Sequence, residues 1–277
     1  MIDLQKMLHY IQRPGRLVAL CFLGLGLLFA PGAFGAHKQT TAVIVPDTLP
    51  FKPGETLTYE ISWSNIVTAG TATMAVKEER LPNGMKVLKC IATSRSVGVV
   101  DKVYPVNDSI ESVFDPRSMQ SLSFDLKESH GKRTRRRQLI FDHAARTVVS
   151  RLNADPPQTL TIPDHVQDAL SSLFYLRTKE DFTIGKVHVI DVHDSGKNWS
   201  VEVHTLGRER IRTPAGEFDT IKVKTFPKYE GVFMNKGEIY IWLTDDSRKL
   251  PVLMKSTISI GSIMTTLTAM KLGEDSR

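Results

Sequence analysis

The chain has 277 residues, of which 41% are hydrophobic and 24% charged, and its formal net charge is +6. This composition is that of a globular protein, which excludes a disordered or fibrous chain and leaves room for one large β domain or two small ones. Residues 1–35 contribute three basic residues and one acidic residue, so the rest of the chain carries a net charge of +4, which indicates an anionic partner only weakly.

Residues 1–35 have the features of a signal peptide. A basic segment with Lys6, Arg13 and Arg16 precedes an apolar run at positions 17–29, and small residues follow at the expected cleavage site. A run of about 13 apolar residues is shorter than the roughly 20 that a transmembrane helix needs. We therefore predict a periplasmic or secreted protein with no membrane span left after cleavage. The alternative is an uncleaved N-terminal anchor.

The residues after this leader divide into a tether and a domain. Residues 36–50 are short and polar at first and carry two prolines, which indicates a flexible tether. Residues 51–277 are predicted to form a single β-rich domain, with two lobes joined near 163–180 as the alternative. Cys90 is the one cysteine left in the exported chain, so no intramolecular disulfide is expected, and we predict a buried small hydrophobic residue.

Alternation of apolar and polar residues predicts strands over most of the domain. The clearest example is 55–63, which ends at Trp63. In the next strand, Gly70 predicts a bulge or a close backbone approach. Turn signals recur every 8–12 residues or so, the spacing of a meander or barrel. The remaining predicted strands are 68–76, 86–94, 121–127, 133–141, 146–152, 158–162, 185–193, 199–205, 208–212, 217–225, 233–243, 252–260 and 263–272, with 99–114 as a mixture of strand and turn.

Four stretches resemble a known family: FKPGETLTYEISWSNIVTAGTATMAV, VQDALSSLFYLR, TPAGEFDTIKV and GEIYIWLTDDSRKLPVLMKSTISIGSI. They are similar to exported bacterial proteins catalogued as domain of unknown function 3108, over about residues 51–272. The resemblance implies export and a β-rich fold, and it implies no activity because the family is uncharacterised. The unit WLTDDSRKLPV also resembles the envelope lipoprotein carriers built on a curved half-barrel.

Residues 163–177 form the one segment after the leader with a clear helical pattern. Pro163 fixes the start, and Asp164 with Gln167 has the spacing of a capping box. Arg177 lies at the end, where a cation suits the helix dipole. A lone amphipathic helix in a β chain must bury its apolar face on the sheet, so we predict a lid or plug on a curved sheet. The residues of that face are Val166, Ala169, Leu170, Leu173 and Phe174.

The predicted hairpin at 121–141 carries the strongest concentration of charge. Arg133, Arg135 and Arg137 share one face of a strand, which predicts a site for phosphate or carboxylate groups. The alternative is a solvated edge strand whose charges prevent aggregation. We expect no nucleic-acid partner, because the chain is exported and no aromatic residues alternate with the arginines. Trp63 and Trp242 are candidates for stacking on a ligand, with core packing as the alternative.

Candidate catalytic and metal-binding residues lack a supporting pattern. His188, His193 and His204 lie on one predicted hairpin, but the first two are five positions apart and point to opposite faces, so we predict no metal. The paired Asp245 and Asp246 fall in a turn, where aspartate bonds to its own backbone. No cofactor motif is present, so no cofactor is expected.

These observations lead to one preferred hypothesis and two alternatives. We predict a mainly β protein, with an antiparallel curved sheet that forms a barrel or half-barrel around one helix. Its expected function is non-catalytic binding or transport of an apolar or amphipathic envelope component, such as a lipid or an envelope glycan. The first alternative is a structural or interaction protein of the cell envelope. The second is a polysaccharide-directed hydrolase with Asp108, Asp168 or Asp246 as its acid. The sequence does not indicate an oligomeric state.

Overall fold

The computed structural model describes residues 48–229, 232–233, 238–258 and 261–274. The predicted signal peptide and positions 36–47 of the tether lie outside these ranges. Neither helix within them is long and apolar enough to cross a bilayer. The elements are β1 (Thr56–Trp63), β2 (Val67–Arg80), β3 (Lys86–Ser96), α3 (Gly98–Val103), β4 (Asn107–Phe114), β5 (Ser121–His130), β6 (Arg133–Asp142), β7 (Thr147–Leu152), β8 (Gln158–Thr161), α4 (Ser171–Arg177), β9 (Val187–Asp194), β10 (Lys197–Thr213), β11 (Gly216–Tyr229), β12 (Val232–Phe233), β13 (Ile239–Thr244), β14 (Pro251–Ile258) and β15 (Gly261–Lys271).

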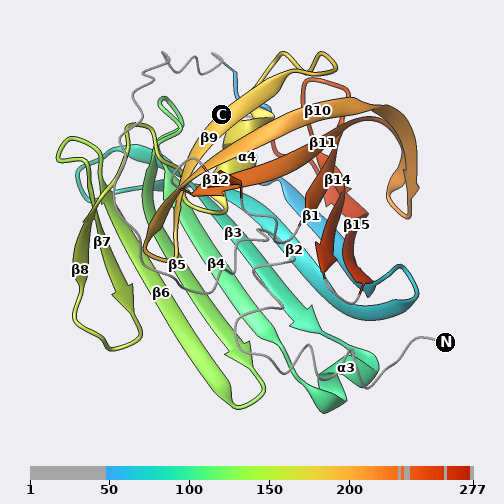
Figure 1. The fold of residues 1–277 in the computed structure, drawn as a ribbon, viewed down its shortest axis with the longest axis horizontal. Coiled ribbons are helices and arrows are strands. Elements are labelled where there is room, and N and C mark those ends of the chain that lie inside the picture. The colour runs from blue at the N-terminus through green and yellow to red at the C-terminus, as the bar shows by residue number, and fades with distance from the viewer. Residues whose placement is uncertain (1–47, 230–231, 234–237, 259–260, 275–277) are drawn as a thin grey trace.

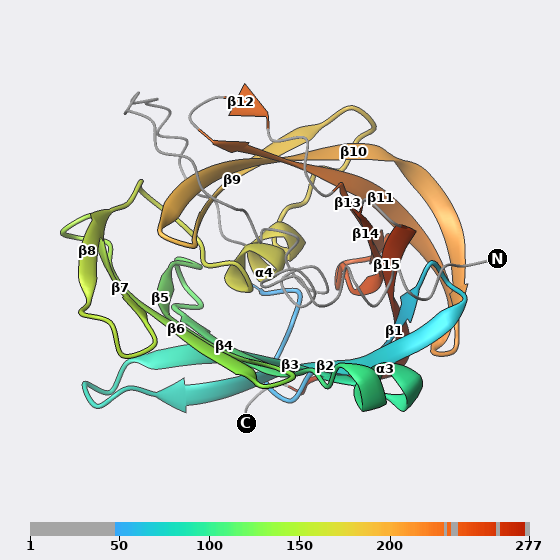
Figure 2. The same ribbon diagram turned by 60° about the horizontal axis from the view of Figure 1, so that its bottom comes forward.

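All strands belong to one antiparallel sheet that curls around α4 (Figures 1 and 2). The order is β8-β7-β6-β5-β4-β3-β2-β1-β15-β14-β13-β11-β10-β9, with β12 paired to β11. Pairing of β1 with β15 joins the first and last strands, so the two halves of the chain form one continuous surface. The prediction of a mainly β, curved antiparallel sheet with a helix packed on it is confirmed.

The segment at 162–170, between β8 and α4, connects the two ends of this sheet. The amide of Gln167 donates to the carbonyl of Asp191 at 2.8 Å, and the amide of His193 donates back to the carbonyl of Gln167 at 2.8 Å. The side-chain amide of Asn198 donates to the carbonyl of Thr161 at 2.8 Å. These bonds tie the β8 end of the sheet to its β9 end, so the curl closes into a barrel-like shape.

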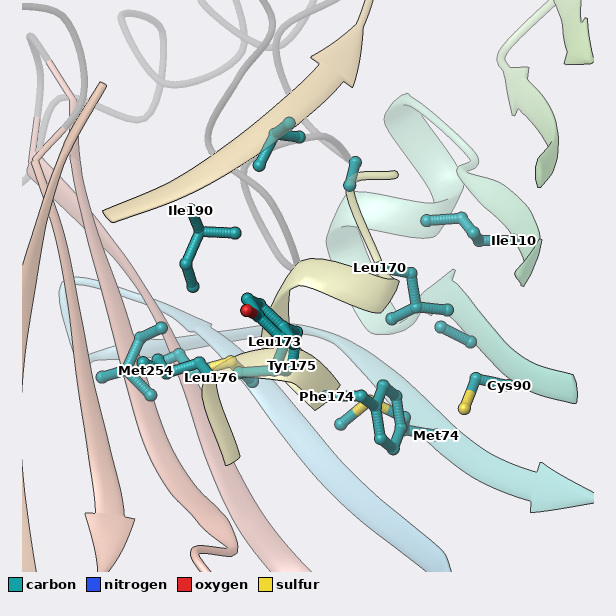
Figure 3. Packing of buried hydrophobic residues seen from close by; sticks show 14 of the residues in the cluster. Met74, Cys90, Ile110, Leu170, Leu173, Phe174, Tyr175, Leu176, Ile190 and Met254 are labelled. Carbon is teal, nitrogen blue, oxygen red and sulfur yellow. The ribbon is translucent and has the colours of Figure 1, made fainter. Parts of the chain in front are cut away.

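The helix α4 is shorter than the predicted 163–177 and is buried on almost every side. Six of its seven residues are buried, including Tyr175 and Leu176, which are not part of the predicted apolar face. Figure 3 shows this helix among side chains from both halves of the sheet, such as Met74, Ile190 and Met254. The helix therefore plugs the concave side, and the five residues of the predicted apolar face are all buried, three of them in the segment before α4.

Asp168, rather than Asp164, caps the helix. Residue 165 has a positive φ of 56°, and the backbone at Gln167 pairs with β9, so the chain is not helical up to Gln167. One carboxylate oxygen of Asp168 accepts the amides of Leu170 and Ser171, both at 2.8 Å. Asp164 instead pairs with Arg146 at the surface.

A buried ion pair fixes the other end of α4. The guanidinium of Arg177 donates to both carboxylate oxygens of Glu55, at 2.6 and 2.9 Å. The side chains of Arg177 and Glu55 are 0% and 4% exposed. The guanidinium also lies 5.0 Å from the ring centre of Phe51 and 5.4 Å from that of Phe174. The helix end is thereby attached to the turn that opens β1.

The remaining differences from prediction are local. Residues 98–103 form the short helix α3, a turn and a half whose length is too small for a periodic pattern. The strands predicted at 199–205 and 208–212 are one strand, β10, because a bulge between Thr205 and Gly207 absorbs Leu206. Part of the strand predicted at 233–243 lies outside the described residues. The prediction for Gly70 is confirmed, since a Cβ there would lie 2.5 Å from the carbonyl oxygen of Arg95.

Candidate functional site

The candidate site lies on the concave face of β4, β5 and β6, at the end of the sheet that carries α3 (Figure 1). Register places Arg133 opposite His130, Arg135 opposite Glu128 and Arg137 opposite Leu126. Arg137 also alternates with Leu139 and Phe141, which are buried in the core. The predicted common face of Arg133, Arg135 and Arg137 is therefore present, and it is the inner face of the sheet. We call Asp108, Glu128, His130, Arg133, Arg135, Arg137 and Asp194 the arginine face.

Asp108 and His130 form a buried pair within the arginine face. The Nε2 atom of His130 lies 3.0 Å from one carboxylate oxygen of Asp108, and the amide of Ser129 donates to the other at 2.9 Å. Burial by itself lowers the pKa of His130, but the hydrogen bond and charge of Asp108, with the charge of Glu128, outweigh it and raise that pKa. The imidazole therefore holds its proton more strongly than a free histidine.

Glu128 and Arg135 form a looser pair. Their nearest charged atoms are 3.8 Å apart, and the side chains are 9% and 40% exposed. Burial raises the pKa of the Glu128 carboxyl, although the charge of Arg135 opposes it. Burial lowers the pKa of Arg135, and the charge of Arg137 adds to this effect. Arg135 thus has a carboxylate nearby and is still partly exposed to solvent.

Arg137 links β6 to the turn between β9 and β10. Its guanidinium donates to Asp194 at 3.0 Å and to the hydroxyl of Ser195 at 2.6 Å. The Ser195 hydroxyl in turn donates to Asp194 at 2.8 Å. The Arg137 and Asp194 side chains are about nine-tenths buried, so Arg137 serves the closure of the sheet and is not available to a ligand.

Arg133 is the most accessible of the three arginines. Among the described residues it has no carboxylate within ion-pair distance, and it is exposed at the rim. On the same concave face, the hydroxyl oxygen of Ser94 is buried without a hydrogen-bond partner; Ser94 pairs with Asp108 across β3 and β4. The arginine face therefore offers the donors of Arg133 and Arg135 to an incoming acceptor.

The two tryptophans proposed for the site do not join the arginines. Trp63 is buried at the end of β1, paired with Ile263 of β15. The indole of Trp242 donates to Glu209 at 2.6 Å, and the ammonium of Lys222 lies 4.9 Å from its ring centre. Trp242 thus faces charged partners of its own. The arginines and the two tryptophans do not form one binding surface.

The aspartates considered as acids are held by structural hydrogen bonds. Besides capping α4, Asp168 accepts the hydroxyls of Ser112 and Ser121, both at 2.6 Å; burial raises its pKa more than these bonds lower it. Asp246 accepts the amide of Arg248 within its own turn at 2.9 Å. Asp108 is likewise held by His130 and by the amide of Ser129, so each of the three aspartates has hydrogen-bond partners within the fold.

The three histidines considered as metal ligands each have a separate hydrogen-bond partner, and the free cysteine is buried in the core. His188 bonds to the carbonyl of Asp181, His193 to Asn198 and His204 to Glu202. No group of three potential metal ligands occurs within the described part of the chain. Cys90 is fully buried, and burial raises the pKa of its thiol well above the usual value, which makes it a packing residue.

Three members of the arginine face, Glu128, His130 and Asp194, escaped the sequence prediction, although a signal was available for the first two. The alternation in β5 places Glu128 and His130 on the same side as Phe124, so their inward direction follows from period two. Asp194 gives no such signal, because its partner Arg137 is 57 positions away.

The fold and site define the class: a barrel-like protein of one curved antiparallel sheet, with a buried helix and a charged inner rim. The chain belongs to the family described as protein of unknown function (DUF3108), which matches residues 58–268. This match confirms the resemblance found in the sequence. A comparison with curated proteins gave no match.

One of three similar solved structures supports the barrel-like architecture, and the other two are more distant. A β-barrel-like protein of domain of unknown function DUF1849 from Brucella abortus has a TM-score of 0.54 at 10% identity, over 81% of this chain and 99% of that one. A protein from Bacteroides fragilis described as exported, with a YmcC-like fold, has a TM-score of 0.34 at 14% identity, over 80% and 98%. One from Parabacteroides distasonis described as a lipoprotein has a TM-score of 0.37 at 13% identity, over 81% and 99%.

Proposed function

We propose that this protein is an exported, non-catalytic binding module of the cell envelope that takes the anionic group of an amphipathic envelope component at the arginine face. The observation that carries the proposal is the placement of Arg133 and Arg135 on the concave face, where Arg133 is exposed and the Arg135 side chain is 40% exposed. Planar guanidinium groups suit phosphate and carboxylate oxygens. Export rests on the predicted signal peptide.

The surroundings of the two arginines suit an amphipathic ligand. Leu126 is half-buried on the same face and pairs with Arg137 on one side and Ile110 on the other. An anionic head group at the rim would therefore place its apolar part beside aliphatic side chains. No step in this function requires a nucleophile or an acid–base pair, which agrees with the structural roles of Asp108, Asp168 and Asp246.

The test compares a monoalkyl phosphate with the alcohol of the same chain length, both below their micelle concentrations, by calorimetry. The chain from residue 36 should bind the phosphate saturably and the alcohol more weakly. Arg133→Ser with Arg135→Ser should weaken phosphate binding about tenfold or more, since charge-assisted bonds contribute about 1.5–3 kcal/mol each. The matched control is Arg210→Ser with Arg212→Ser, which removes two exposed arginines from β10. No saturable binding, or equal loss in both variants, would contradict the proposal.

A second candidate is an envelope interaction protein that uses the outer edge of β9. Gln167 forms a bridge to Val192 of β9. The part of β9 that precedes Val192 pairs, within the described residues, only with β10. Val187 and Val189 are 37% and 57% exposed along this edge. An exposed edge with alternating apolar residues can add a strand from a partner. Saturable binding of the phosphate would favour the first candidate over this one.

A further inference from the structure

The end of the sheet that carries α3 combines exposed apolar side chains with basic residues. The turn between β1 and β2, the helix α3 and the turn between β5 and β6 all lie at this end, since β1, β3 and β5 end there and β2, β4 and β6 begin there (Figures 1 and 2). A hydrogen bond of 2.7 Å from the amide of Gly131 to the carbonyl of Pro105 joins the last two. We call Ile66, Arg95, Val99, Lys102, Val103 and Lys132 the α3 rim.

The apolar members of the α3 rim are unusually exposed. Ile66, Val99 and Val103 are 68%, 58% and 46% exposed. Val99 and Val103 are four positions apart and share one face of α3, whereas Val100 on another face is buried and anchors the helix to the core. Two valines held outward by an anchored helix form a fixed apolar surface.

The positive charge of the α3 rim comes from three basic residues, Arg95, Lys102 and Lys132. Within the described ranges, Arg95, Lys102 and Lys132 have no carboxylate within ion-pair distance. Elsewhere on the surface Arg136 pairs with Asp125, and Arg210 pairs with Asp219. The exposed acidic residue at the rim is Asp101, which accepts the hydroxyl of Ser96 at 2.6 Å. The rim therefore has a net positive charge beside its apolar side chains.

We infer that the α3 rim docks on an anionic phospholipid surface. Apolar side chains flanked by lysine and arginine are the arrangement that enters the boundary between lipid head groups and acyl chains. Each basic residue near an anionic surface adds attraction that falls off within a Debye length. The inference uses residues distinct from Arg133 and Arg135, so it does not depend on ligand binding at the arginine face.

Sedimentation with vesicles tests the docking. The chain from residue 36 is mixed with phosphatidylglycerol–phosphatidylethanolamine vesicles and with phosphatidylcholine vesicles. We expect partition onto the anionic vesicles, weakened by added salt and much weaker on the neutral ones. Val99→Glu with Val103→Glu, and separately Lys102→Glu with Lys132→Glu, should each reduce partition about tenfold or more. Circular dichroism and thermal melting confirm that each variant is folded.

The matched control is Ile140→Glu with Val149→Glu. These two residues are 62% and 38% exposed and pair directly across β6 and β7, so the control adds the same two charges at a comparable apolar pair away from the rim. It should bind anionic vesicles as the parent does. Absence of binding to anionic vesicles, equal binding to neutral vesicles, or equal losses in rim and control variants would each overturn the inference.

Discussion

Arg177 and Glu55 are 122 positions apart and meet in the interior in a bidentate ion pair with essentially no solvent contact. The pair joins the last residue of α4 to the turn before β1, and the guanidinium also donates to the carbonyl oxygens of Pro50 and Arg248. One side chain thus ties the plug helix to the start of the sheet and to the turn before β14. The helix is held at this end by charge and along its length by apolar packing.

Breaking this pair should destabilise the fold strongly. Arg177→Met leaves the carboxylate of Glu55 buried and unpaired, and a buried pair that loses one partner costs about 3–5 kcal/mol of unfolding free energy. Urea denaturation of the chain from residue 36 measures the loss. As a control, Arg212→Met breaks the exposed pair with Glu217 and should cost about 1 kcal/mol or less.

The double variant Glu55→Leu with Arg177→Met distinguishes the loss of the ion pair from the cost of leaving one buried charge without a partner. Because it removes both charges, it should recover part of the stability that Arg177→Met loses. If the double variant were less stable than the single one by the full cost of a second deletion, the two side chains would act independently, contrary to the geometry.

Asp168 should behave as a helix cap and as the common acceptor of several buried hydrogen bonds, rather than as a catalytic acid. Asp168→Ala removes the acceptor for two backbone amides and two serine hydroxyls, and should cost about 2–4 kcal/mol of unfolding free energy. Asp168→Asn should cost less, because the amide oxygen still caps α4 and the hydroxyls of Ser112 and Ser121 can turn to accept from its N–H groups. Equal losses for the two variants, measured in urea, would show that the charge itself is required.

Asp142→Ala is the reference for this measurement. Asp142 is exposed and accepts the amide of Ala145 at 2.8 Å in the turn after β6. Removal of this solvated bond should cost less than about 1 kcal/mol of unfolding free energy. The additional loss in Asp168→Ala then measures the contribution of the buried hydrogen bonds of Asp168.

The three arginines of β6 should separate into two classes. Arg137→Ser leaves Asp194 buried without its cation and loosens the connection to the β9–β10 turn, so about 3 kcal/mol or more of unfolding free energy should be lost. Arg133→Ser should change stability by about 0.5 kcal/mol or less, because the side chain is exposed and has no described carboxylate partner. Thermal melting of both variants checks this; equal melting temperatures would contradict a closing role for Arg137.

Most strands of this sheet could be predicted from the alternation of apolar and polar residues, because within each strand the apolar positions are those on the buried face. The common face of Arg133, Arg135 and Arg137 on β6 followed from period two, and the close approach at Gly70 followed from the small residues around it. What alternation cannot show is which side of a charged strand is concave. For β6, three positive charges suggested a solvated or ligand-facing surface, whereas a carboxylate on a remote turn neutralises one of them.

The start of α4 shows the same limit. The apolar spacing at Val166 and Ala169 fits a helix, and both residues are buried. The backbone at Gln167 nevertheless pairs with β9, a contact formed only when the sheet closes. Local propensity is weak compared with such tertiary pairing, so the helix begins at Ser171.

The two buried histidines His130 and His193 should affect stability with opposite dependence on pH. The folded-state pKa of His130 is raised above 6.5 by Asp108 and Glu128 despite burial. Its stabilisation is therefore fully present below pH 6.5 and is lost as the pH rises through the folded-state pKa. Burial lowers the pKa of His193 below 6.5, with Asn198 opposing the shift, so the unfolded chain takes up a proton first and stability falls as the pH drops below 6.5.

Urea titrations of the parent, His130→Gln and His193→Gln across about pH 5 to 9 measure both effects. The stability advantage of the parent over His130→Gln should be largest at the acidic end and shrink toward the alkaline end. The advantage over His193→Gln should shrink toward the acidic end instead. Parallel pH profiles for the two variants would mean that Asp108 does not hold a proton on His130, and the charge balance assigned to the arginine face would then be wrong.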